Sequence, residues 1–140
     1  MCIRDSGYLY YQEFGEDDGS TAPTSAITAY VESSQLSIGS GDKFVFLKRL
    51  IPDITFDGSS TDEPTLEFTL KSRRFPGASY HSSETGAVTQ TATVPVEQFT
   101  NEKNIRLRGR SFALRVESDD LEVMWRLGTP RVDIREDGRR

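Results

Sequence analysis

The sequence predicts an all-β protein, either an antiparallel sandwich or a propeller-like sheet domain of short strands. Three observations lead to this class. Apolar and polar residues alternate in many short runs, the period of a strand with one buried face. Residues typical of turns separate these runs at intervals of about 8–12 residues. Helical periodicity is nearly absent along the 140 residues.

The N-terminal third predicts two strands separated by turns. Gly7–Phe14 is rich in aromatic residues and predicts a strand, which an acidic turn at residues 15–19 follows. Apolar residues then alternate with polar ones over residues 27–32, which predicts a half-buried strand. The pattern extends over residues 36–38 before Gly39–Asp42 turns the chain.

The next segments contain the clearest strand. Phe44–Ile51 is apolar at both odd and even positions, which is typical of a strand buried on both faces or crossing the core. Pro52 interrupts it before a short continuation at residues 54–56. Residues 65–71 alternate cleanly and predict a strand with one face in the core.

A long polar loop and an edge strand follow. Residues 75–87 are mostly polar, and a loop of that length projects from a sheet. Alternation over residues 92–96 then predicts a strand. Because Pro95 cannot donate a backbone hydrogen bond, we expect this strand at a sheet edge.

A change of parity marks the last third. Ile105 and Leu107 occupy odd positions. The large apolar residues that follow, Phe112, Leu114 and Val116, occupy even ones. The apolar side chains of both runs can face the core only if the strand accommodates one extra residue between them. We therefore expect a β-bulge at Gly109.

Trp125 lies in the next run of alternating residues, 123–127, on the apolar side. We expect its ring to anchor the core or an interface, with sugar stacking as the alternative. Residues 132–134 predict the final strand.

The charge of −5 is unevenly distributed. Residues 1–70 carry 4 Lys/Arg and 12 Asp/Glu, whereas residues 71–140 carry 13 and 10. The basic excess is small and interleaved with acids, which does not favour a nucleic-acid groove. No run approaches the ~18 apolar residues of a membrane-spanning helix, so we expect no membrane partner.

The hexapeptide Met1–Ser6 resembles the translation of a transposase adapter end from shotgun sequencing libraries. We therefore treat residues 1–6 as an artefact, which removes Cys2 from consideration as a native thiol. Residues 7–140 are expected to form a single all-β domain, the C-terminal fragment of a longer protein.

Three stretches resemble the C-terminal region of structural proteins of tailed phages, the tail nozzle or tail tubular B-like proteins. They are residues 29–33 with 38–42, residues 50–58, and the C-terminal series 106–112, 125–128, 130–135 and 137–140. The C-terminal series, with Trp-Arg-Leu-Gly and a final Asp-Gly-Arg-Arg, is the most specific part.

The resemblance implies a structural subunit of a phage virion, a homo-oligomeric ring in the tail through which DNA leaves. It implies contacts with identical subunits and other virion proteins, with synthesis in the cytoplasm of the bacterial host. It implies no cofactor and no active site. A receptor- or glycan-binding β-module of a tail fibre, with the loop over residues 75–87 at the contact, is the alternative. A depolymerase fragment would need an active site upstream of residue 7.

Arginines punctuate the final strands, and four are candidates for subunit contacts: Arg108, Arg110, Arg126 and Arg131. Most of these arginines are expected to form cross-strand ion pairs on a solvated face, each worth about 0.2–1 kcal/mol. Because the guanidinium group can pair with a carboxylate through two parallel hydrogen bonds, we expect two or three of these arginines in ion pairs between subunits. Contact with the phosphates of passing DNA is the alternative.

Catalytic and metal-binding arrangements are not evident. His81 is the only histidine and lies in a polar loop, which disfavours a multi-histidine metal site or a triad. Acids around Asp53 and Asp57 lack the spacing of an EF-hand loop, and turn chemistry explains them without Ca²⁺. We therefore expect neither an enzyme nor a metal protein.

Overall fold

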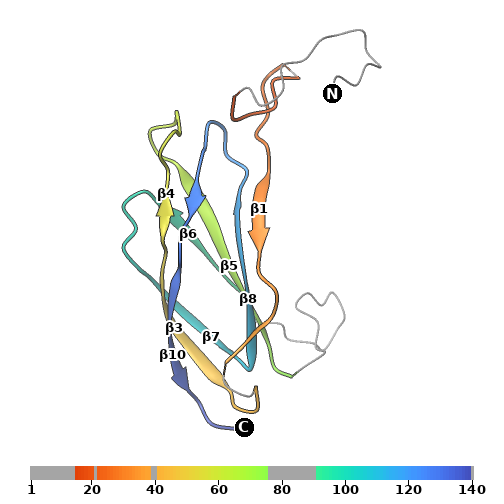
Figure 1. Cartoon of the computed structure of the whole chain (residues 1–140), viewed down its shortest axis with the longest axis vertical. Coiled ribbons are helices and arrows are strands. Elements are labelled where there is room, and N and C mark those ends of the chain that lie inside the picture. Colours follow the sequence, from red (N-terminus) through yellow and green to blue (C-terminus); the bar gives the residue numbers. More distant parts are fainter. Residues whose placement is uncertain (1–14, 21, 39–40, 76–90, 140) are drawn as a thin grey trace.

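The computed structural model describes residues 15–20, 22–38, 41–75 and 91–139. Within these ranges the chain forms ten β-strands and no helix, which confirms the predicted all-β class. Two antiparallel sheets pack face to face, so the architecture is a sandwich (Figure 1).

The larger sheet has the strand order β1-β8-β5-β6, and β2 pairs with the same edge of β8 as β1 does. Its strands are β1 (Ala29–Glu32), β2 (Leu36–Ser37), β5 (Thr65–Arg73), β6 (Thr91–Glu97) and β8 (Ser111–Ser118).

The smaller sheet has the strand order β10-β3-β7, and a separate ladder joins β4 to β9. The strands are β3 (Val45–Ile51), β4 (Ile54–Thr55), β7 (Lys103–Gly109), β9 (Arg126–Leu127) and β10 (Arg131–Glu136). Both termini of the described chain lie at the ends of the long axis (Figure 1).

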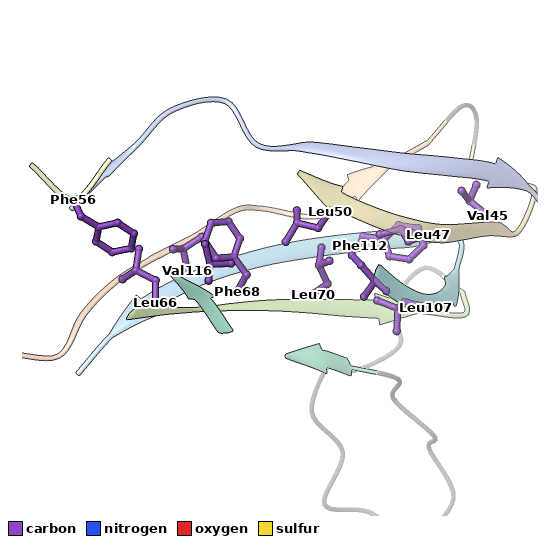
Figure 2. Packing of buried hydrophobic residues seen from close by; sticks show 12 residues of the cluster. Val45, Leu47, Leu50, Phe56, Leu66, Phe68, Leu70, Leu107, Phe112 and Val116 are labelled. Atoms are coloured by element: carbon purple, nitrogen blue, oxygen red, sulfur yellow. The ribbon is translucent and has the colours of Figure 1, made fainter. Parts of the chain in front are cut away.

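The hydrophobic core fills the space between the two sheets (Figure 2). Phe68 of β5 and Leu50 of β3 are fully buried, and Leu107 of β7 is 1% exposed. In β5 the alternation is the predicted one, with Leu66, Phe68 and Leu70 toward the core. Their burial is the main stabilising contribution, about 1.5–3 kcal/mol for each side chain.

The double apolar parity of β3 comes from a register shift. Val45 and Leu47 are buried at odd positions, whereas Leu50 is buried at an even one. The pairing of β3 with β10 and with β7 shifts register around Lys48. After this irregularity the side chains that face the core are at even positions instead of odd ones. The prediction of a strand buried on both faces is therefore wrong: β3 buries one face, and an irregularity in its middle changes which positions form that face.

Gly109 forms a corner between the sheets. β7 ends at Gly109 in the smaller sheet, and β8 begins at Ser111 in the larger one. The expected change of parity is present, but it occurs where the chain changes sheets and not as a bulge within one ladder. A Cβ on Gly109 would lie 2.8 Å from Ser72 Cβ and 3.0 Å from the Arg73 carbonyl oxygen, so this corner requires glycine.

Two other segments differ from expectation. The alternation over residues 27–32 predicts a half-buried strand, yet all four residues of β1 are exposed, because the smaller sheet does not extend over this margin. Only Arg126–Leu127 of the run 123–127 is strand. The predicted strand Gly7–Phe14 and the loop 76–87 lie outside the described residues.

Candidate interaction surfaces

Two of the four candidate arginines meet at the Gly109 corner. The guanidinium carbons of Arg108 and Arg110 lie 4.2 and 4.7 Å from the centroid of the Phe44 ring. Arg108 also forms an ion pair with Asp137, and Arg110 Nη2 donates to the Arg139 carbonyl oxygen at 3.3 Å. These contacts join the corner to the end of the chain, so both arginines stabilise the fold of one subunit.

Arg126 and Arg131 lie apart from that cluster. Both are exposed, in β9 and β10, and neither side chain forms an ion pair with another described residue. Trp125, just before β9, is partly buried and packs against the core cluster beside Val123 and Leu127. Its ring therefore contributes packing at the edge of the core.

The outward face of the larger sheet carries a charge network that the sequence analysis did not identify. Lys71 Nζ donates to Glu32 Oε2 at 2.8 Å, and Arg115 Nη1 donates to the same oxygen at 3.3 Å. Arg115 Nη2 also donates to Glu117 at 2.5 Å, and its guanidinium carbon lies 4.0 Å from the Tyr30 ring centroid. β1, β8 and β5 bring these side chains together, so only the strand order reveals the network.

The network has clear electrostatic consequences. Lys71 is only 5% exposed, and the hydrogen bond from its ammonium group is the main reason that the pKa of Glu32 lies below its usual value. The hydrogen bond to Glu117 raises the pKa of Arg115. Beside them is an open hollow of about 380 Å³, lined by charged and threonine side chains of β5, β6 and β8.

Apolar side chains are exposed along the margin of the larger sheet. We define the β1 margin as Ile27, Tyr30, Val31 and Leu36, whose exposed fractions are 52, 60, 44 and 55%. Val31 pairs with Val116 and Leu36 with Phe112, and both partners are buried in the core. Since cross-strand partners share a face, Val31 and Leu36 lie on the core side of the sheet, and no described segment covers them.

One end of the sandwich is strongly acidic. Residues 15–20, 56–64, 97–101 and 118–125, here called the acidic end, hold ten Asp/Glu and no Lys/Arg. Hydrogen bonds join three of these segments: the Asp17 carboxylate accepts from the Glu122 N–H, and the Glu122 carbonyl accepts from the Ser60 N–H at 3.0 Å. An open hollow of about 350 Å³ lies at this end beside Phe99, which is 86% exposed.

The opposite end is basic. Residues 41–44, 73–75, 108–111 and 136–139, here called the basic end, hold six Lys/Arg and three Asp/Glu. The Arg110 N–H donates to the Arg73 carbonyl at 2.8 Å, and the Asp137 N–H donates to the Phe44 carbonyl at 2.9 Å. The fold thus gathers acidic segments from both halves of the sequence at one end of the sandwich and basic segments at the other.

Asp53, one of the acids considered for Ca²⁺, has a structural position. Its Oδ2 accepts a hydrogen bond from the Thr129 N–H at 2.7 Å, and its carbonyl accepts from the Gly128 N–H at 2.8 Å. Within the described ranges there is no group of three His, Cys, Asp or Glu that could hold a metal ion. The same part of the chain contains no helix suited to crossing a membrane.

Comparison with known proteins gives no family assignment, because no protein-family model and no curated protein sequence matches the chain.

Proposed function

We propose that the chain is a structural, self-associating β-sandwich module of a bacteriophage tail component, of the nozzle or tubular kind. The single observation that carries the self-association is the uncovered β1 margin. Exposed apolar side chains on the core side of a sheet, here Val31 and Leu36, are typical of surfaces that other protein covers. The resemblance of the C-terminal third to phage tail proteins supports the virion assignment.

The arrangement of the β1 margin also supports an assembly role over a catalytic one. Val31 and Leu36 project from a rigid sheet whose partner residues are locked in the core. A surface on regular strands keeps its shape, which suits repeated contacts in an assembly. The module's work is then to present this surface to other subunits.

Sedimentation velocity of the full chain over a concentration series tests self-association. We expect a concentration-dependent oligomer that Val31→Ser weakens about tenfold, because each contact loses apolar area from both copies. Ile134→Ser is the matched control, since Ile134 is 48% exposed but lies on β10 in the smaller sheet. A chain that stays monomeric at all concentrations contradicts the proposal.

The virion assignment has its own test. The DNA that flanks this reading frame in its source should encode other virion proteins, such as portal and terminase. Flanking genes of metabolism, or an upstream hydrolase fused in frame, contradict the assignment.

A further inference from the structure

The free edges of the two sheets are not equally protected against pairing with another strand. β6, at one edge of the larger sheet, contains Pro95, and β10, at an edge of the smaller sheet, carries Arg131, Asp133 and Arg135. Proline and charged side chains are the usual devices that keep edges from pairing. β1 has neither lysine nor proline, and its one charged residue, Glu32, is held by Lys71 of the same subunit.

No strand among the described residues pairs with the outer edge of β1, so its backbone offers hydrogen-bonding groups there. Ser33 N–H donates to the Leu114 carbonyl at 2.8 Å, in the same register as the β1–β8 ladder. In an antiparallel pair every second residue directs its N–H and C=O toward the partner strand. Residues 29, 31 and 33 therefore face β8, whereas Thr28, Tyr30 and Glu32 direct their backbone groups outward.

The acidic end and the basic end together favour a second copy of this chain as the partner, in an antiparallel orientation. β1 runs along the long axis, with the acidic end beyond Ala29 and the basic end beyond β2 (Figure 1). A second copy placed antiparallel brings its basic end beside the acidic end of the first. A parallel copy would set ten carboxylates beside ten others, which is unfavourable.

We propose that two copies of this chain pair antiparallel along β1 about a two-fold axis, with Tyr30 opposite Tyr30 of the partner subunit. This inference rests on the self-association proposed above and names its contact. Thr28 then lies opposite Glu32 of the partner subunit, so that all the outward backbone groups of both strands are paired. Val31 lies beside Ala29 of the partner subunit, and the two larger sheets continue into one.

Disulfide cross-linking tests this register directly. In the background Cys2→Ser, we expect Tyr30→Cys to form a covalent dimer rapidly under mild oxidation. The Cα atoms of a hydrogen-bonded antiparallel pair are about 5.5 Å apart, within the range of disulfides. Thr28→Cys is the matched control, because the two Thr28 residues would be offset by four positions along the strands, about 14 Å at ~3.4 Å per residue. Thermal melts of both variants check that the sandwich is intact.

A second variant tests the edge without a new bond. Thr28→Pro removes an outward N–H for which the described residues supply no acceptor, so the fold should be retained while the dissociation constant rises at least tenfold. Thr28→Val keeps the N–H and should dimerise like the parent. Raising the ionic strength should weaken the dimer several-fold, because it screens the attraction between unlike ends.

The outcomes separate this inference from the function on which it rests. Selective cross-linking at Tyr30, with loss of the dimer in Thr28→Pro, supports it. Self-association that Thr28→Pro leaves unchanged, or that tightens at high salt, overturns the β1 pairing and leaves the assembly role standing. A monomer under all conditions overturns both.

Discussion

Replacing Gly109 with alanine should cost about 2–4 kcal/mol of stability. The added methyl group would lie 2.8 Å from Ser72 Cβ, 3.0 Å from the Arg73 carbonyl oxygen and 3.3 Å from Phe112 Cε1. Ser72 and Phe112 are 3 and 4% exposed, so neither can move into solvent without opening the core. Overpacking of this kind costs about 1–3 kcal/mol.

The same methyl group would also disturb a backbone hydrogen bond. Arg73 accepts from the Arg110 N–H at 2.8 Å, and the corner would have to move away from that carbonyl. Weakening this bond adds about 0.5–1.5 kcal/mol. The sum is a large fraction of the ~5–15 kcal/mol by which domains are stable.

Urea denaturation followed by tryptophan fluorescence measures this loss, because Trp125 is the only tryptophan. With a slope of about 1–3 kcal/mol per molar urea, the midpoint should fall by roughly 1 M or more. Gly19→Ala is the matched control, since no atom lies within 4 Å of its added Cβ. A midpoint for Gly109→Ala that equals that of the control would refute the close-packed corner.

Three further predictions concern stability. Glu32→Gln should cost about 1 kcal/mol at neutral pH, because Lys71 loses a charged partner. The pKa of Glu32 is lowered in the folded state, so its contribution is complete above about pH 4.5 and disappears as the pH falls through the folded value. Trp125→Ala should cost about 1–3 kcal/mol, less than a fully buried tryptophan, because its ring is only partly buried. Gly128→Ala should cost about 1 kcal/mol, because its Cβ would lie 2.4 Å from Asp53 Oδ2 and displace that carboxylate from the Thr129 N–H.

Each of these predictions has a measurement that contradicts it. Urea midpoints at about pH 7 and about pH 3.5 should differ more for the parent than for Glu32→Gln, and equal differences refute the pairing. Heat denaturation of Trp125→Ala should be compared with Leu121→Ala, whose side chain is 48% exposed, and equal melting temperatures refute the packing. Asp53→Ala should reproduce the loss in Gly128→Ala, and the double variant should lose no more than either alone.

Much of the fold follows from local pattern. The strict alternation of residues 65–71 placed β5 correctly, and the apolar run after Phe44 placed β3. The change of parity after Leu107 indicated an irregularity near Gly109. Sequence pattern did not distinguish a bulge from a corner, because that difference depends on which strands β7 and β8 pair with.

The interaction surfaces were less predictable. Alternation over residues 27–32 predicts a half-buried strand equally well whether or not a second sheet covers it, so the exposure of Val31 was not evident. The network around Lys71 joins residues far apart in sequence, and only the strand order brings them together. Arginine-rich composition indicates ion pairs, and Arg108 forms one with Asp137, but the stacking of Arg108 and Arg110 on Phe44 was not evident from the sequence.

The central claim is that the β1 margin is the surface on which this protein assembles. Hydrogen–deuterium exchange of the full chain at low and high protein concentration tests it most directly. We expect peptides over residues 26–37 to become protected at high concentration, while peptides of β5 exchange slowly at both. If residues 26–37 exchange at the same rate at both concentrations while the chain self-associates, the margin is not the contact and the claim fails.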